Sequence, residues 1–297
     1  MEKAKLKRSS LPRKHRGKKL RLSRSLGGNI VLLLFLAIVG AFMALPLVYT
    51  LITAFKPVEE LFIFPPRFFV RNPTVDNFIQ MIQLTQEMWV PFSRYLFNSL
   101  FEAFGGTAAY VLIASMAAFP LAKYNSKLLK IYEAVIIWAI LFRTEVTSIP
   151  LYVIIAKFRM IDTYWAIILP VMAGSFGVFL MRQFIDGFPN TTLEAARIDG
   201  AGEIAIVFRI VMPVVKPAWL TLIVFTFQSF WNTTGIQYIY EENLKTLPVV
   251  LKQITTGGMA RAGAASAVAL VLLIPPILIF VLAQSSVVET MAHSGIK

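Results

Sequence analysis

The 297-residue sequence contains no cysteine, and its two histidines, His15 and His293, stand near opposite ends of the chain. The absence of cysteine excludes disulfides and thiolate metal sites. Neither histidine is joined by a cluster of acidic residues, and no nucleophile–base spacing is visible, so we expect neither a metal site nor an enzyme. The G-x-x-x-x-G-K-[ST] pattern is also missing, which excludes ATP binding by a P-loop in this chain.

Charged residues are scarce as well. They make up 15% of the chain, whereas hydrophobic residues make up 57% and the mean hydropathy is +0.68. A soluble globular domain carries about 25% charged residues, so the bilayer is the expected solvent. At roughly 45 residues for each span with its loop, the length predicts an all-α integral membrane protein with six transmembrane helices.

The net charge of +13 is concentrated at the N-terminus. Residues 1–29 carry ten of these thirteen charges, and no aromatic residues alternate with the basic ones, so nucleic acid is not an expected partner. A basic tail before a long apolar run predicts a cytoplasmic N-terminus that contacts anionic membrane lipids. The basic side chains are Lys3, Lys5, Lys7, Arg8, Arg13, Lys14, Arg16, Lys18, Lys19, Arg21 and Arg24.

Apolar runs and helix breakers divide the remainder of the chain. The first run is too long for the apolar region of a signal peptide and should stay as a helix. The expected order is a basic cytoplasmic tail, a first transmembrane helix, an external loop, a core and a cytoplasmic C-terminal tail, at residues 1–29, 30–55, 56–94, 95–288 and 289–297. Within the core, hydropathy predicts five further spans at about residues 95–122, 131–155, 164–184, 218–240 and 264–288.

The polar interruption before the fifth of the six spans, residues 187–213, is the most informative segment. Thr191 and Glu194 have capping-box spacing, which predicts a helix that begins there. Gly200 can adopt the left-handed conformation that ends this helix, and a second short helix is expected over residues 201–210. The pattern predicts a helix–turn–helix knuckle on the cytoplasmic side.

This segment resembles the EAA loop of type I ABC importer permeases, E-A-A-x3-G-x9-I-x-L-P. The matching positions are Glu194-Ala195-Ala196, Gly200, Ile210 and Pro213, and Met212 replaces the usual leucine. Wider features are similar to the sugar-importer, maltose-type branch and cover about residues 45–297. They are Asn98-Ser99-Leu100, Pro150-Leu151-Tyr152, Asp199-Gly200-Ala201, Phe208, Trp231-Asn232 and Thr246-Leu247-Pro248-Val249. The chain departs from that branch at Thr233 and at Glu289-Thr290.

The resemblance implies a MetI-like permease fold and a transport machine in a prokaryotic plasma membrane. This permease would pair with a second, homologous permease and with two cytoplasmic ATPase subunits, which hold ATP and Mg. An extracellular solute-binding protein would deliver a sugar, in particular an oligosaccharide. Coupling to the ATPase is then expected from Glu194, Ala195, Ala196, Asp199, Gly200, Ala201, Phe208, Ile210 and Pro213.

Residues of the substrate pathway are harder to predict. Arg143 and Glu145 are ionisable residues inside the third span, where a charge is costly, so they either line the pathway or pair with another helix. In the fifth span the amide and aromatic side chains of Gln228, Trp231 and Asn232 could contact sugar rings.

Alternative functions remain open from the sequence. The same machine could carry another small solute, or the chain could be an ion-coupled secondary transporter in which Glu145 binds a proton. Against the transporter, no inverted repeat is evident and the 187–213 segment would have no role. The G-x-G-x-x-A pattern from Gly200 to Ala205 does not follow a strand, which argues against dinucleotide binding.

Overall fold

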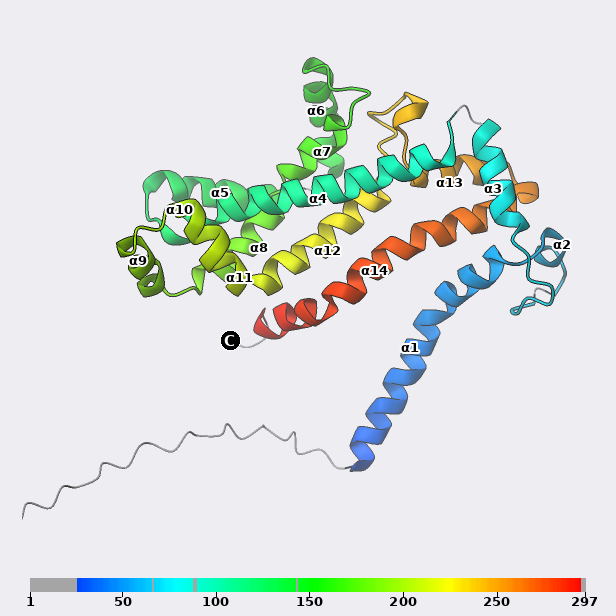
Figure 1. Ribbon diagram of the computed structural model, residues 1–297, viewed down its shortest axis with the longest axis horizontal. Coiled ribbons are helices and arrows are strands. Elements are labelled where there is room, and N and C mark those ends of the chain that lie inside the picture. The colour runs from blue at the N-terminus through cyan, green and yellow to red at the C-terminus, as the bar shows by residue number, and fades with distance from the viewer. Residues whose placement is uncertain (1–25, 66, 88–89, 143, 295–297) are drawn as a thin grey trace, which may run out of the picture. The chain divides into compact units, whose positions relative to one another are not determined.

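The computed structural model describes residues 26–65, 67–87, 90–142 and 144–294, and over these ranges it is helical without strands (Figure 1). The chain divides into two units, residues 1–48 and 49–297. Each unit is described by itself below. The prediction of an all-α fold is confirmed for the described residues.

The described part of the first unit is one apolar helix. Helix α1 spans Leu26–Ala54, close to the predicted 30–55, and its last residues belong to the second unit. Residues 27–54 are long and apolar enough to cross a bilayer. Between residues 27 and 48 nearly every side chain is exposed.

The second unit begins with a folded segment where the sequence predicted a loop. It contains α2 (Val58–Leu61) and α3 (Asp76–Glu87). The carboxylate of Glu60 accepts hydrogen bonds from the backbone N–H groups of Arg71 and Asn72, at 3.2 and 3.1 Å. These bonds give the segment a fixed shape without a large core.

Helix α4 (Phe92–Lys123) is the central element of this unit. Its 32 residues span about 48 Å at 1.5 Å per residue, in agreement with the predicted span 95–122. It packs against α8 (Ser175–Asp186) and α12 (Lys216–Asn232), and α12 packs against α14 (Ala262–Ser294) (Figure 1).

Small residues at the start of α8 let α4 approach closely. A Cβ atom at Gly177 would lie 2.6 Å from the ring of Tyr110 on α4. The Tyr110 hydroxyl donates to the Gly174 carbonyl and accepts from the Gly177 N–H, at 2.9 and 2.7 Å. These bonds satisfy backbone groups at the break between α7 (Trp165–Met172) and α8.

Two predicted spans differ from the structure. The third was expected as one helix but forms α5 (Lys127–Leu141) and α6 (Thr144–Lys157), with a break between them. The fifth was expected to reach residue 240, but α12 ends at Asn232. There the chain turns back through Gly235, whose φ of +59° suits glycine.

By length and composition, four described helices can cross a membrane, or up to six if each bent pair counts as one span. The bent pairs are α5 with α6, and the segment from Glu203 to Val214 with α12. The count of six spans therefore stays a prediction.

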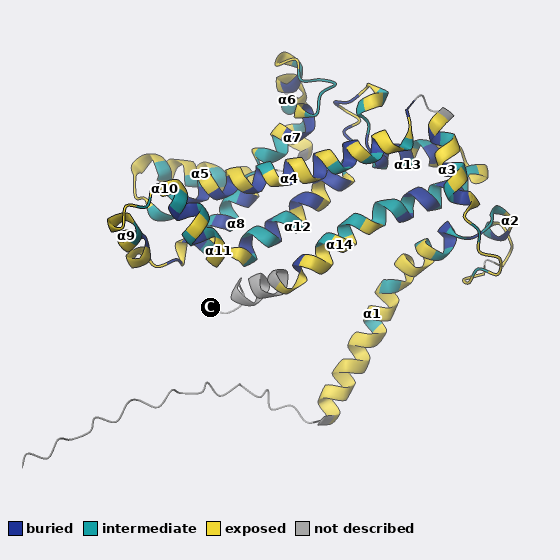
Figure 2. Ribbon diagram, in the orientation of Figure 1, coloured by how far each residue is buried: buried dark blue, intermediate teal, exposed yellow. Residues whose placement is uncertain are grey.

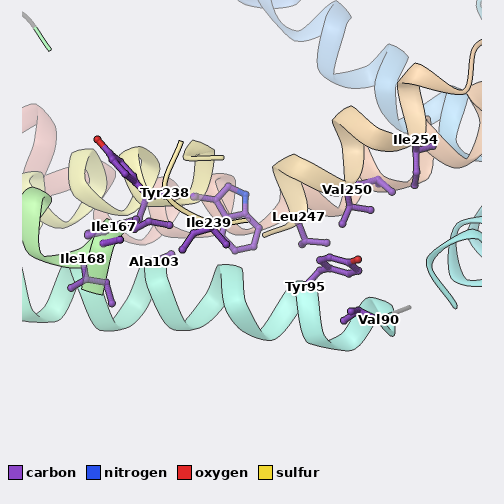
Figure 3. Close-up of a cluster of buried hydrophobic side chains, with 14 of the residues drawn as sticks. Val90, Tyr95, Ala103, Ile167, Ile168, Tyr238, Ile239, Leu247, Val250 and Ile254 are labelled. Carbon is purple, nitrogen blue, oxygen red and sulfur yellow. The ribbon is translucent and has the colours of Figure 1, made fainter. Parts of the chain in front are cut away.

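Two clusters of buried apolar side chains lie along α4. Figure 2 colours the buried residues of the helices dark blue. The first surrounds the half that begins at Phe92 and contains Tyr95, Trp231 and Leu247. Figure 3 shows Tyr95 and Leu247 there beside Val250, which belongs to α13 (Leu247–Thr256). The second cluster surrounds the half that ends at Lys123 and joins α4, α8 and α12 to the polar interruption.

Candidate functional site

The interruption between α8 and α12 forms a folded knuckle, defined here as residues 187–215. Its elements are α9 (Asn190–Ile198), α10 (Glu203–Ala205), a wider π-type turn (Ile206–Val211) and α11 (Met212–Val214). Leu193 of α9 is 1% exposed in the second cluster, where Ile206 and Val211 are fully buried. The knuckle is thus attached to the helices through an apolar base.

Lys123, at the end of α4, fixes the start of the knuckle. Its Nζ donates to the backbone carbonyls of Asp186 and Phe188, at 3.0 and 2.6 Å. The end is fixed by Trp219 of α12, whose Nε1 donates to the Met212 carbonyl at 3.0 Å. Both connections use backbone carbonyls near helix ends, which need partners.

The predicted capping box at Thr191 and Glu194 is wrong. Helix α9 begins at Asn190 after Pro189, and no side-chain hydrogen bond caps it. Pro189 lies in the extended region at φ −64° and ψ 128° and sets the chain direction before the first turn. Thr191 is therefore already inside the helix, where its hydroxyl cannot act as the N-cap.

The predicted stop at Gly200 is confirmed. Gly200 has a φ of +82°, its N–H donates to the Arg197 carbonyl at 3.0 Å, and the Ala201 N–H donates to the Ala196 carbonyl at 2.9 Å. This pair of bonds is a Schellman motif. Ala196 and Ala201 are half-buried against the second cluster, which is the apolar contact that accompanies the motif.

The second half of the knuckle is helical but not one regular α-helix. Val207 and Val211 are buried, and Phe208 and Ile210 are half-buried against the second cluster. Ile204, three residues before Val207, is instead 70% exposed. The π-type turn changes the number of residues per turn, so the spacing no longer brings all these side chains to one face.

One face of the knuckle is open to the surroundings. Glu194, Ala195 and Asp199 are exposed, and Ile198 is 86% exposed. A hollow of about 680 Å³ is lined by Gly202, Glu203, Ile204, Ala205, Phe208 and Arg209. Exposed isoleucines beside a hollow on a polar segment are typical of a protein-binding surface. The sequence analysis missed Ile198 and Ile204, although two isoleucines in a polar loop were a visible signal.

An ionic contact links the two halves of the knuckle with the end of α4. The Arg197 Nε lies 2.8 Å from Glu203 Oε1, and Arg197 also donates to the Tyr124 hydroxyl at 3.1 Å. The hydrogen bond from Arg197 holds the pKa of Glu203 below its ordinary value, and burial raises the pKa of Tyr124. We call Tyr124, Arg197 and Glu203 the brace. The sequence did not indicate it.

The candidate pathway residues are dispersed. Arg143 lies outside the described residues, and Glu145 is exposed in the first turn of α6. Gln228 and Asn232 lie one turn apart on the exposed face of α12. Trp231 is instead 1% exposed, and its Nε1 donates to the Leu272 carbonyl of α14 at 2.8 Å. In this structure Trp231 therefore joins two helices.

Long apolar helices around α4 fit a multi-pass membrane protein, and the knuckle lies at one end of α4. Residues 110–291 match the family described as "Binding-protein-dependent transport system inner membrane component". The chain belongs to this family. It is a transport permease component of ABC importers and not a catalytic enzyme.

Curated relatives and a solved structure agree with this assignment. The chain is 31% identical to Protein LplC of Bacillus subtilis, over 75% of this chain and 74% of LplC. It is 26% identical to the arabinooligosaccharides transport system permease protein AraQ of Halalkalibacterium halodurans, over 89% and 93% of the two chains. A bacterial ABC transporter that imports the acidic polysaccharide alginate has the same fold, with a TM-score of 0.75 at 18% identity over 88% of this chain and 98% of that chain.

Proposed function

We propose that this chain is the membrane permease of an ATP-driven importer for a sugar, an oligosaccharide in particular. The relatives support the substrate class, because AraQ is named for arabinooligosaccharides and the structural neighbour for alginate. The observation that carries the proposal is the knuckle, whose Gly200 motif holds Glu194 and Ala195 on an exposed face.

In the proposed topology the chain crosses a prokaryotic plasma membrane six times, with both termini in the cytoplasm. The bent pair of α5 and α6 then counts as span three, and the 17 residues of α12 form span five. Residues 1–29 and 289–297 are the cytoplasmic tails, residues 56–94 the external segment, and residues 95–288 the core. This arrangement places Lys123 and the knuckle on the side that contains ATP.

The proposed coupling follows from burial within the knuckle. Glu194, Ala195 and Asp199 face outward and would contact the ATPase, while Gly200 sets the angle of α9. The half-buried residues would pass motion into the second cluster, and Pro213 would direct the chain into α12. These half-buried residues are Ala196, Ala201, Phe208 and Ile210.

The proposed partners are a second, homologous permease, two cytoplasmic ATPase subunits that hold ATP and Mg, and an extracellular solute-binding protein. A structural neighbour, the alginate ABC transporter, is in complex with a pentasaccharide-bound periplasmic protein, which supports the last of these. The exposed amides of Gln228 and Asn232 are unsuited to lipid, so we assign them to the pathway or to the second permease. Arg143, Glu145 and Trp231 remain candidates for the same pathway.

Uptake by the assembled transporter in liposomes tests this function. Radiolabelled arabino-oligosaccharide and alginate oligosaccharide are offered outside with their binding proteins, ATP is enclosed inside, and ionophores collapse every ion gradient. We expect uptake of a sugar that stops when ATP is omitted. Uptake driven by a proton gradient in liposomes without ATP and without ionophores would instead establish a secondary transporter. ATP-driven uptake of a different small solute alone would refute the sugar assignment.

A further inference from the structure

A buried carboxyl group on α4 is not explained by the proposed coupling. Glu102 is 0% exposed, and neither of its carboxyl oxygens has a hydrogen-bond partner among the described residues. Burying a carboxyl group without partners costs several kcal/mol. Glu102 therefore does not stabilise this conformation, and the sequence analysis missed it as a single acid within the predicted span 95–122.

The helical turn before Glu102 binds a neighbouring loop. We call residues 241–247 the strap. The Asn98 Nδ2 donates to the strap carbonyls of Asn243 and Lys245, at 2.8 and 2.9 Å. The Ser99 Oγ accepts a hydrogen bond from the Leu247 N–H at 2.9 Å. Because residues three and four positions apart share one face of a helix, the strap attaches to the face that carries Glu102.

Side chains from other elements also pack along α4 on both sides of Glu102 in the sequence. Tyr164 donates to the Asn98 Oδ1 at 2.7 Å, and the Phe230 ring packs so closely on Gly106 that a Cβ there would lie 2.3 Å from it. Thr107 Oγ1 is a further buried atom without a partner among the described residues. The unpaired carboxyl group of Glu102 thus lies one helical turn from the two residues that hold the strap by hydrogen bonds.

We propose that Glu102 belongs to the substrate pathway and that the strap hides it in this conformation. When the strap leaves α4 in the outward-facing state, the carboxylate accepts hydrogen bonds from neighbouring hydroxyl groups of the sugar. The proposal rests on the proposed function, because it requires a second conformation driven by ATP. A metal cation is a poor alternative, since no group of three or more His, Cys, Asp or Glu residues that could hold one is found among the described residues.

Cysteine accessibility tests the opening directly, because the natural chain contains no cysteine. A Glu102→Cys variant is assembled into the full transporter in liposomes, and a membrane-impermeant maleimide is added outside, without nucleotide or after trapping with ATP and vanadate. We expect this chain to react at least about tenfold faster after trapping. Equal reaction in both states, or none in either, would overturn the proposal.

The matched control is Ala103→Cys, because Ala103 is the next residue of α4 and is also 0% exposed, but belongs to the apolar first cluster. We expect no reaction at this position in either state. Reaction of both variants after trapping would mean general loosening of α4, and it would also overturn a specific opening at Glu102.

Uptake kinetics test the sugar contact and do not depend on the cysteine variant. Glu102→Gln keeps a hydrogen-bonding group of similar size, whereas Glu102→Leu does not. We expect Glu102→Leu to raise the KM of whichever of the two oligosaccharides the wild type takes up by about tenfold or more, and Glu102→Gln to restore most of the affinity. An unchanged KM in Glu102→Leu would overturn the contact. If the wild type itself shows no ATP-driven uptake, the proposed function fails instead.

Discussion

The two ends of α4 hold their neighbouring segments by different means. At the Lys123 end, the knuckle is shaped by its own backbone hydrogen bonds at Gly200 and anchored by the buried side chain of Leu193. At the Phe92 end, the strap is held by hydrogen bonds with two buried polar side chains, Asn98, which donates, and Ser99, which accepts. The first arrangement suits a rigid lever, and the second suits a closure.

This difference follows from the forces involved. Apolar burial is non-directional, so it keeps the knuckle attached during a tilt that would strain the hydrogen bonds from Lys123 and Trp219. A hydrogen bond depends on distance and angle, and each contributes only about 1 kcal/mol net to stability. A few such bonds hold the strap closed, and a modest displacement breaks them together. During transport we therefore expect the knuckle to keep its shape while the strap changes its contacts.

The largest effect is expected from Gly200→Pro. Proline fixes φ near −65°, whereas Gly200 has +82°, and it removes the N–H that bonds to Arg197. A local cost of about 3 kcal/mol corresponds to roughly a hundredfold loss of ATP-driven uptake. Uptake is measured in liposomes with equal amounts of assembled transporter.

A matched pair of alanine variants separates the effect of the left-handed backbone at Gly200 from the effect of adding a Cβ atom. Neither Gly200 nor Gly202 has an atom within 4 Å of an added Cβ, but Gly202 has a φ of −72°. We expect Gly200→Ala to weaken uptake by about tenfold and Gly202→Ala to leave it near wild type. Equal uptake in both variants, or full uptake in Gly200→Pro, would contradict the proposal that the knuckle acts as a rigid lever.

Asn98→Ala is expected to release the strap. It removes the donor to two strap carbonyls and the acceptor for Tyr164, which weakens strap attachment by about 2–3 kcal/mol. Hydrogen exchange of residues 241–247 should accelerate by roughly 30-fold to 150-fold, with no change in the knuckle. Phe97→Ala, at an exposed position on the same helix, is the control. Unchanged exchange in the strap would contradict its description as a closure.

A smaller effect is expected from the brace. Arg197→Glu places two acidic groups together, because Arg197 pairs with Glu203, and uptake should fall by at most about fivefold. The double variant Arg197→Glu with Glu203→Arg should recover most of the loss, and high salt should reduce the difference. Failure of the double variant to recover would mean that Arg197 acts through contacts other than this ion pair.

The smallest effect is that of pH on the strap. Burial disfavours the charge of Glu242, but hydrogen bonds from Lys245 and Tyr95 outweigh it and leave its pKa below the ordinary 4.5. Because the folded pKa is the lower one, these bonds stabilise the strap fully above the ordinary value and lose their effect as the pH falls through the lowered pKa.

Strap exchange should therefore be constant from pH 7 to about pH 5 and accelerate only below about pH 4.5. Hydrogen exchange, corrected for its intrinsic pH dependence, measures this, and Glu242→Gln should abolish the acid step. Release of the strap between pH 7 and 6 would show that another group controls it.

Local signals in the sequence predicted part of this structure. The left-handed turn at Gly200 was predictable because few residues other than glycine adopt it. The span at α4 was predictable from its hydropathy. In each of these cases the information lies within one segment.

The remainder depends on distant parts of the chain. The helix start at Asn190 is set by the direction in which Pro189 leads the chain, which defeats the capping pattern at Thr191. Asn98 bonds to strap residues about 147 positions away, and no local pattern indicates such a pair. Glu102 is a single acid within the predicted span, and only the structure shows that it is fully buried without a hydrogen-bond partner among the described residues.

Cross-linking from the tip of the knuckle tests whether the knuckle docks on an ATPase subunit. Ile198 is 86% exposed at the end of α9, and the chain has no cysteine of its own. In the assembled transporter, Ile198→Cys labelled with a short benzophenone maleimide should yield, on irradiation, one cross-linked product that contains this chain and an ATPase subunit. Docking of the knuckle on the ATPase is contradicted if the variant transports normally and reacts freely with a soluble maleimide, but never cross-links to the ATPase.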